Sequence, residues 1–437
     1  MSIGGYYRVG ADIIGGNNEK DSDLDARVTG DYGNRGRLNF KAQNDDGTFG
    51  GFLRLQTGVE LPVVGAQSQI LNLAWAWWQP IEMLKLQAGK LDDFYVNEII
   101  DDPFGGNAEE TNVHYKGYYT NDVIVKAFAQ DFSGDNAIGA ALSIYPIEGL
   151  ALNLSVPYIF GNLASADPAD QAYSHMLGQV QYSIENVGRL SLAFRGTKGY
   201  ANADADADQA AIAAAITAAI MGGETSDSVF KKIYEDNISL SGVEGDNHAI
   251  YAAFYFTMIE NMGVNLGLKF TLPYSDEDDY NGSKLNYTYN APFLIGLGFK
   301  YDLDALGFAA RLGVGLGESW KWDVTIENGN PVEFNDIKVE GDGKGPTLLA
   351  VQILPSYDIG ACRIHLNAGL DMWLPDEGDS ELGFYINPYA SKVIGGGSFF
   401  AGFKLTSPPG DYLTKDDGTK GDKKIYWSIP VGMKFSF

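Results

Sequence analysis

Hydrophobic and polar residues alternate with a period of two along most of this 437-residue chain, and the C-terminal segment has the most complete pattern. Every odd position between Ile425 and Phe437 is apolar, whereas the even positions include Ser428, Lys434 and Ser436. Successive side chains of a β-strand point to opposite faces. The segment is therefore predicted to be a strand with one apolar face and one largely polar face.

Similar segments recur along the chain, joined alternately by short turns and long polar stretches. An Asp-Gly turn at 44–47 joins two alternating segments and is a strong signal for a β-hairpin. Further short turns are predicted at 80–83, 119–122, 145–149, 185–188, 259–262, 302–306, 357–361 and 394–397. The long polar stretches cover 94–110, 158–172, 199–245, 274–290, 319–345 and 408–422.

This asymmetry is typical of an all-β transmembrane antiparallel β-barrel with short periplasmic turns and long external loops. The predicted strands have about 10 residues, which is enough for a tilted strand to cross a bilayer. Nine turns and a strand outside each end would give twenty strands. Because a hairpin near 111–131 is open to another assignment, we predict eighteen to twenty strands, with twenty favoured, in one domain spanning 1–437.

A soluble β-sandwich is the alternative fold. It accounts for the apolar faces, but it accounts poorly for the long ladders of Arg, Lys, Gln and Asn on the opposite faces. A wide barrel with a water-filled interior accommodates those ladders. The tryptophans near strand ends are expected in aromatic girdles at the membrane interfaces. They are Trp75, Trp77, Trp78, Trp373 and Trp427.

Composition and charge narrow the function classes. The chain contains 54 glycines, 25 tyrosines and 23 phenylalanines but only 16 prolines, which is strand-rich composition. Its formal net charge of -26 makes phosphate-mediated nucleic-acid binding very unfavourable. Cys362 is the only cysteine, which excludes an internal disulfide and a multi-cysteine metal site.

Residues 204–222 break the period of two. This alanine-rich segment has strong helix propensity, acidic residues at its start and a glycine stop, so one short helix near 206–221 is predicted inside the long external loop 199–245. Two placements are open. The helix either lies on the surface of the loop or folds toward the pore mouth and narrows it.

Three features make the chain resemble the general diffusion porins of Gram-negative outer membranes. It ends in Phe437 after alternating apolar residues, similar to the C-terminal signal strand read by the outer-membrane assembly machinery. The segment Asp102-Pro103-Phe104-Gly105-Gly106 resembles the Pro-Glu-Phe-Gly-Gly turn of the porin constriction loop, without its acid between Pro and Phe. Residues 111–115, Thr-Asn-Val-His-Tyr, are similar to the strand start that follows that loop. The signal residues would be Ile429, Val431, Met433, Phe435 and Phe437.

The resemblance implies an inward-folded constriction loop at 94–110 whose carboxylates face a basic wall. Opposed charges across a narrow pore create a transverse field that orients polar solutes. There are two alternatives to this field. Either the loop carboxylates are only solvated, or the basic wall residues only form ion pairs within the wall. The acidic candidates are Asp92, Asp93, Glu98, Asp101, Asp102, Glu109 and Glu110, beside the turn residues Pro103, Phe104, Gly105 and Gly106. The basic candidates are Arg35, Arg37, Lys41, Arg54, Lys85, Lys116 and Lys126.

Metal and catalytic chemistry have little support. The acidic runs at 275–279 and 416–417 are candidates for calcium, but neither has the ligand spacing of an EF-hand, so no cofactor is predicted. Neither a Gly-x-Ser-x-Gly elbow nor a phosphate-binding loop is present in the sequence, so the protein is not expected to be an enzyme.

The leading hypothesis is an outer-membrane porin that passes small hydrophilic solutes and ions by diffusion. The net charge of -26 predicts weak cation selectivity. A sugar-selective channel is the close alternative, because many aromatic residues could form a stacking track. An adhesin or structural barrel that binds partners through 199–245 and 319–345 is the alternative of another class. The resemblance alone implies a homotrimer.

Overall fold

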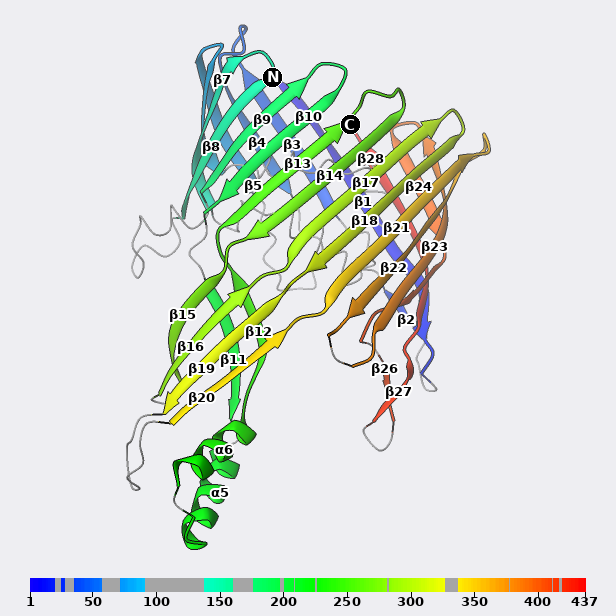
Figure 1. Ribbon diagram of the computed structural model, residues 1–437. Coiled ribbons are helices and arrows are strands. Elements are labelled where there is room, and N and C mark those ends of the chain that lie inside the picture. The colour runs from blue at the N-terminus through cyan, green and yellow to red at the C-terminus, as the bar shows by residue number, and fades with distance from the viewer. Residues whose placement is uncertain are drawn as a thin grey trace.

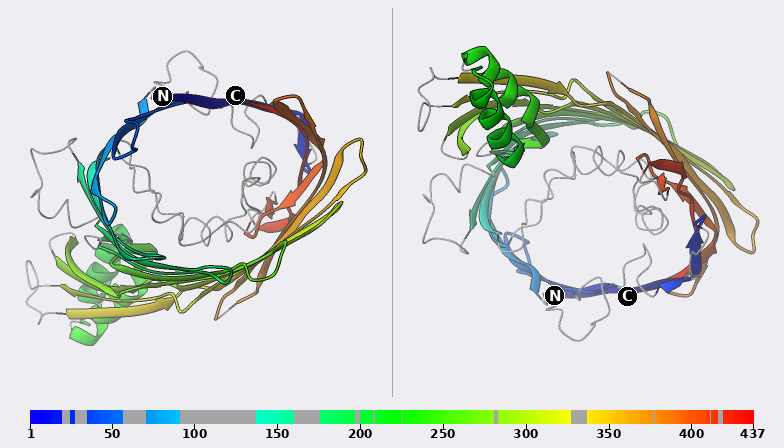
Figure 2. Two further views of the ribbon diagram at one scale, coloured as in Figure 1. Left: turned by 90° about the horizontal axis from the view of Figure 1, so that it is seen from above. Right: turned by 90° about the horizontal axis from the view of Figure 1, so that it is seen from below.

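Eighteen antiparallel strands close into a barrel in the computed structural model of this protein (Figure 1). Each strand pairs with the next along the chain, and β28 pairs with β1, so the ring is closed (Figure 2). The segments β2 and β3 share one position beside β1, and β24 and β25 share one position between β23 and β28. The structure describes residues 1–19, 25–27, 35–56, 71–90, 137–159, 176–196, 200–207, 209–224, 226–280, 283–326, 337–376, 378–410, 412–415 and 419–437.

The first half of the barrel comprises β1 (Ser2–Asn17), β2 (Asp25–Arg27), β3 (Arg35–Gln43), β4 (Phe49–Gln56), β5 (Leu71–Ile81), β6 (Leu84–Lys90), β7 (Ala137–Ile147), β8 (Leu150–Ile159), β9 (Leu177–Ile184) and β10 (Gly188–Arg195). The second half comprises β13 (Ala249–Phe256), β14 (Met262–Thr271), β17 (Phe293–Leu303), β18 (Leu306–Leu316), β21 (Thr347–Asp358), β22 (Arg363–Leu374), β23 (Glu381–Ile394), β24 (Gly397–Gly402), β25 (Lys404–Ser407) and β28 (Tyr426–Ser436).

Eight of the nine predicted short turns join neighbouring barrel strands, and both termini lie at their end of the barrel (Figure 1). Asn186, Asn261 and Asp304 adopt positive φ angles of 57°, 62° and 44° in three of these turns. Asn and Asp tolerate this conformation better than most residues. The ninth predicted turn, 119–122, lies outside the described residues.

The favoured count of twenty strands is wrong. β6 pairs directly with β7, with Lys85 opposite Ser143, so the ring has no position for a hairpin between these two strands. The count of eighteen, the lower bound of the prediction, is the one that the barrel adopts.

The barrel is apolar outside and polar inside. On β10, Leu190 and Leu192 are 52% and 54% exposed, whereas Ser191 and Ala193 between and beside them are buried. The cross-strand register carries this alternation from strand to strand around the ring. A soluble protein would bury its leucines, so the inverted pattern indicates that lipid covers the outer face.

Not all the tryptophans lie in the expected girdles. Trp78 is 53% exposed on the outer face, but its neighbour Trp77 is buried on the inner face, where its indole N–H donates to the Gly47 carbonyl at 3.2 Å. The register places Trp75 and Trp373 on the inner face as well. The girdle interpretation is therefore wrong for these three residues. Strand parity, the odd or even position of a residue along its strand, decides which face its side chain takes, and nearness to a strand end does not.

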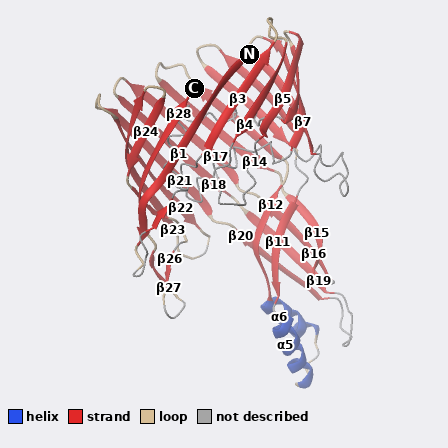
Figure 3. Ribbon diagram, turned by 180° about the vertical axis from the view of Figure 1, so that it is seen from behind, coloured by secondary structure: helices blue, strands red, loops and turns tan. Residues whose placement is uncertain are grey.

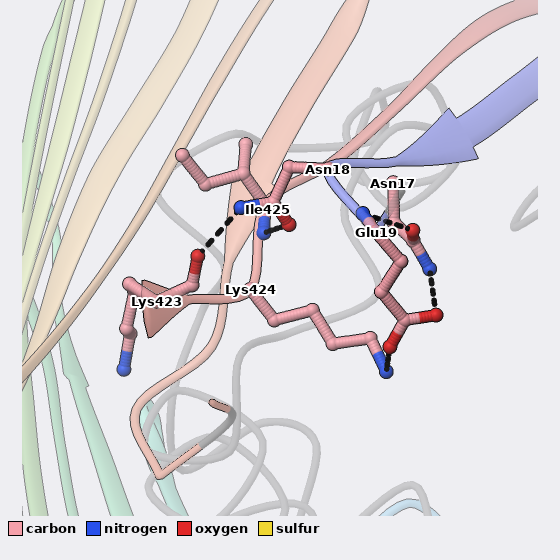
Figure 4. A network of polar contacts seen from close by, with 6 residues as sticks. All are labelled: Asn17, Asn18, Glu19, Lys423, Lys424 and Ile425. Atoms are coloured by element: carbon pink, nitrogen blue, oxygen red, sulfur yellow. Dashed lines mark hydrogen bonds and ion pairs between the residues drawn. The ribbon is translucent and has the colours of Figure 1, made fainter. Parts of the chain in front are cut away.

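The seam between the first and last strands closes the barrel at both ends. At one end the backbone N–H and C=O groups of Gly5 and Phe437 exchange hydrogen bonds of 2.9 and 3.0 Å. At the other end the Asn18 side chain donates to the Lys423 carbonyl at 2.8 Å and accepts from the Ile425 N–H at 2.9 Å (Figure 4). Glu19 forms an ion pair of 2.8 Å with Lys424 beside it. These contacts extend the pairing of β1 with β28 beyond the strands themselves.

Replacing Asn18 with alanine is expected to destabilise the closed barrel by about 1–2 kcal/mol, because two backbone groups at the seam lose their partner. The measurement is the temperature at which the folded band converts to the unfolded band in detergent electrophoresis. Asn44→Ala, at a hairpin turn away from the seam, is the control for loss of a side-chain amide. An unchanged conversion temperature for Asn18→Ala would contradict the role of the seam.

Six barrel strands continue past the long-loop end as an extension that projects from the rim (Figure 1). The predictions of long loops at 274–290 and 319–345 are therefore wrong, because residues 274–280, 283–290, 319–326 and 337–344 form a four-stranded sheet. Its aromatic side chains Tyr287 and Tyr289 are buried. The extension comprises β11 (Tyr200–Ala207), β12 (Ile238–Asp246), β15 (Tyr274–Tyr280), β16 (Ser283–Asn290), β19 (Ser319–Ile326) and β20 (Ile337–Lys344). A separate short hairpin, β26 (Tyr412–Thr414) with β27 (Lys420–Lys423), lies in the stretch 408–422.

Two helices lie at the far end of the extension (Figure 3). α5 (Gln209–Met221) matches the predicted helix, although its first turn contains no acidic residue, because Asp204 and Asp206 belong to β11. The sequence reading missed α6 (Asp227–Asn237), whose Phe230 is buried. The helices lie away from the barrel, so the hypothesis of a helix narrowing the pore mouth is wrong. Among the described residues, no helix has the length and apolar character needed to cross a membrane.

One ion pair ties the extension to the loop between β22 and β23. Lys344 lies 2.7 Å from Asp376. The hydrogen bond to Asp376 raises the pKa of Lys344 above its usual value of 10.5. Because the folded-state pKa is raised, this tie contributes at neutral pH and is lost as the pH rises through the raised value.

Replacing Asp376 with asparagine is expected to lower the pKa of Lys344 toward 10.5, because the charged partner is removed. The measurement is an NMR titration of isotopically methylated lysines. Asp342→Asn is the matched control and is expected to give a smaller fall, because Asp342 acts on Lys344 only through a weaker Coulombic effect. An equal fall in both variants would show that the ion pair is not formed.

Candidate functional site: the inner wall of the barrel

Basic and amide side chains interleave on the inner face of β3 and β4. Arg37 donates to Gln56 through Nε at 2.9 Å and through a terminal nitrogen at 2.7 Å. Arg54 donates from Nε to Asn39 at 3.0 Å. Both pairs follow from the register, which sets Arg37 opposite Gln56 and Arg54 opposite Asn39. The amides hold the guanidinium groups in place without neutralising their charge.

Aromatic rings support the same cations. The Arg37 guanidinium and the Lys434 ammonium lie 5.3 and 4.9 Å from the centre of the Tyr6 ring. Lys41 lies 5.6 Å from the Trp77 ring. Such contacts contribute about 0.5–1 kcal/mol each where water is present. They connect β28, β1, β3 and β5 in one inward-facing surface.

Part of the predicted constriction can be placed. Arg37, Lys41, Arg54 and Lys85 lie on the inner face, and Arg35 lies on the same strand as Arg37 and two positions from it. Lys116 and Lys126 lie outside the described residues, as do the loop 94–110, its turn Pro103–Gly106, and the acidic candidates Asp92, Asp93, Glu98, Asp101, Asp102, Glu109 and Glu110. Whether carboxylates face the basic wall stays a prediction.

The charge of the barrel strands is opposite in sign to that of the whole chain. Ten consecutive strands, β3 to β10 with β13 and β14, contain no Asp or Glu. They do contain basic residues that the sequence reading did not single out, among them Arg189, Arg195 and Lys269 on the inner face. The sequence did contain a signal for these three residues, because each stands at a polar position of an alternating segment. The net charge of -26 therefore arises outside the barrel strands.

Several inward-facing aromatic rings lie flat against the wall, over glycines of the next strand. A Cβ at Gly432 would collide with the Phe400 ring, and a Cβ at Gly402 would meet the Tyr389 side chain. Phe400 and Tyr389 are 8% and 4% exposed. Glycine on one strand thus makes room for an aromatic ring on its neighbour. These two rings are therefore packed into the wall, and little of either is exposed to the lumen.

The candidate assembly-signal residues share one face of β28. Ile429, Phe435 and Phe437 are exposed, and Phe435 packs edge-on against Phe399 with ring centres 5.7 Å apart. The parity of the strand places Val431 and Met433 on the same outer face. Recognition by assembly machinery stays a prediction.

The two acidic runs give no further support for calcium. Residues 275–279 belong to β15, and 416–417 lie outside the described residues. In the part of the chain that the structure describes, no three His, Cys, Asp or Glu side chains come together in a way that could hold a metal ion.

Comparison with known proteins gives structural similarity only. No protein-family model matches the chain, and no curated protein matches it. The anion-selective porin from Comamonas acidovorans superposes with a TM-score of 0.43 and 10% identity, over 100% of this chain and 99% of that one. Salmonella typhi OmpF in complex with daunomycin gives 0.43 and 12%, over 100% and 97%. A mutant of the Rh. blastica porin gives 0.41 and 12%, over 100% and 99%.

Similarity at these identities and scores does not transfer to this chain what those proteins bind or conduct. The fold of this chain rests on its own strands. A closed ring, an outward apolar face, an inward polar face and short turns at one end are together the fold of a porin-like outer-membrane β-barrel, as the sequence predicts.

Proposed function

We propose that this protein is a porin of the bacterial outer membrane, a water-filled channel through which small hydrophilic solutes and ions diffuse. The observation that carries the proposal is the inverted alternation around a closed ring of eighteen strands. Barrels of 16–18 strands are wide enough to leave an aqueous channel. The long ladders of Arg, Lys, Gln and Asn on the inner wall are expected in a water-filled interior and not in a packed core.

The test is the conductance of purified protein in a planar lipid bilayer. Stepwise, voltage-independent increases in current at low protein concentration are the expected result. Protein that inserts, as judged by protease protection of its strands, yet carries no current would overturn the proposal.

The finer proposal is weak cation selectivity, from a net charge of -26. The barrel strands oppose it, because ten of them contain no Asp or Glu and five of those ten carry Lys or Arg. Cation preference must therefore come from carboxylates outside the barrel strands. A reversal potential in a salt gradient that indicates anion preference would refute this part alone.

A sugar-selective channel is the second candidate, favoured by the aromatic rings that face the lumen. Phe52 and Trp75 lie on the inner face with ring centres 5.6 Å apart, and Trp75 and Trp77 follow at 5.4 Å. Consecutive rings of this kind can stack on the apolar faces of a sugar chain. Saturable block of the current by an added maltooligosaccharide, absent in Trp75→Ala, would favour this candidate over unselective diffusion.

The extension supports the candidate of another class, a barrel that binds partners outside the cell. Its four-stranded sheet buries Tyr287 and Tyr289 and so forms a folded module and not a pair of flexible loops. Replacing 200–246 with a short linker is expected to leave conductance intact if the barrel is a channel. A homotrimer and the absence of enzymatic activity stay predictions, the first testable by chemical cross-linking in detergent.

A further inference from the structure

A cavity of about 570 Å³ opens on the inner wall at the short-turn end of the barrel. It lies where three neighbouring hairpins meet, those of β17 with β18, β21 with β22, and β23 with β24. None of the basic-wall candidates that the structure describes lines it, so it is separate from that part of the wall. Its volume is in the range of small-molecule binding sites.

An arginine and an aspartate that are paired in the register of neighbouring strands both line this cavity without forming an ion pair. The register sets Asp358 of β21 opposite Arg363 of β22. Arg363 donates from Nε to the Ser356 hydroxyl at 3.0 Å, and Asp358 accepts the backbone N–H of Gly360 through Oδ1 at 2.7 Å. Within the described residues neither charged group has an ion-pair partner, so the terminal N–H groups of Arg363 and the second oxygen of Asp358 remain available.

The rest of the lining includes a ring stack, a hydrogen bond and an ion pair, and the lining as a whole is balanced in charge. The His365 ring stacks on Tyr389 with centres 4.3 Å apart and planes inclined by 3°, and its Nε2 lies 2.8 Å from the Ser391 hydroxyl. Lys300 and Asp302 form an ion pair of 2.9 Å. Three basic and three acidic side chains line the cavity in all, Lys300, Arg363 and Lys392 with Asp302, Asp304 and Asp358.

We propose that this cavity binds a zwitterionic solute of the amino-acid or short-peptide class. The ligand carboxylate would accept hydrogen bonds from the terminal nitrogens of Arg363, a geometry that favours carboxylates. Its ammonium group would lie at Asp358, and the stacked His365 and Tyr389 would form an apolar floor. A lining of balanced charge gives little net attraction to a simple anion or cation, but it matches a ligand that carries both charges. The inference rests on the proposed channel, because the solute reaches the cavity through the lumen.

The test is calorimetric titration of the detergent-solubilised full-length protein with three peptides of equal length. Dialanine carries both charges, N-acetyl-dialanine only the carboxylate, and dialanine amide only the ammonium. We expect dialanine to bind about tenfold more tightly than either blocked peptide. Arg363→Gln and Asp358→Asn are each expected to weaken dialanine binding about tenfold. Lys321→Gln, which removes one positive charge from the extension, is the control and is expected to bind dialanine as the parent does.

Each outcome decides the question. Equal binding of N-acetyl-dialanine and dialanine would identify a plain anion site and overturn the proposal, as would absence of dialanine binding or unchanged binding in both variants. Folding of each variant is checked by its migration in detergent electrophoresis, and the two substitutions test the two ends of the ligand separately. Calorimetry needs no current, so binding without conductance would refute the channel, whereas conductance without binding would refute only this site.

Discussion

Replacing Leu192 with arginine is expected to lower the free energy of unfolding of the barrel in a lipid bilayer by about 2–4 kcal/mol. Leu192 is 54% exposed on the outer face and lies near the middle of β10. A guanidinium group at this depth meets hydrocarbon and must be hydrated by a distortion of the bilayer. The measurement is urea-induced unfolding of the protein in phospholipid vesicles, followed by tryptophan fluorescence.

Two controls separate burial in lipid from other effects. Leu192→Ala removes the side chain without adding charge and is expected to cost less than the arginine. Leu306→Arg places the same charge at a hairpin tip, where the residue is 47% exposed, and is expected to cost about 0–1 kcal/mol. Equal costs at Leu192 and Leu306 would mean that the outer face of β10 does not lie in the membrane.

Strand parity is the part of this fold that the sequence predicts best. In β28 the alternation between Ile425 and Phe437 determines both faces, because lipid and water select side chains at every second position. Hairpins with short turns, such as 44–47, could also be located, since the turn residues are local signals. The strand count could not, because it depends on whether β6 pairs with β7 across 46 intervening residues.

The extension was missed for a different physical reason. Its strands do not face lipid, so they lack an apolar stripe, and the acidic run of β15 resembles a loop. A period of two was nevertheless present in the aromatic residues Tyr287, Tyr289, Trp320 and Trp322. Likewise Asp204 and Asp206 alternate with alanine, which suits a strand, although acidic residues before an alanine run also suit a helix start.

The cavity beside Arg363 has no local signal at all. Its lining comes from three hairpins spread over residues 300–393, and the register of β21 with β22 sets Asp358 opposite Arg363. A one-residue slip in that register would turn either side chain to the lipid face. Sequence patterns locate the polar positions of the wall, but pairing determines which of them meet.

The second large effect concerns selectivity. Neutralising Arg37, Lys41, Arg54 and Lys85 together by substitution with glutamine is expected to raise the cation-to-anion permeability ratio about twofold or more. These four positive charges lie on strands without Asp or Glu, so their removal leaves the field of the lumen to carboxylates elsewhere. The measurement is the reversal potential across a bilayer in a gradient around 0.1 M salt, where charges act over about 10 Å.

The matched control removes the same charge from the extension, by glutamine at Lys231, Lys232, Lys321 and Lys338. These side chains are exposed and lie beyond the barrel, so screening by salt should leave the reversal potential almost unchanged. If both quadruple variants shift the potential equally, selectivity follows the net charge of the whole chain and not the inner wall. If the reversal potential of the lumen variant shifts toward anion preference, or does not shift, these residues do not face the permeating ions.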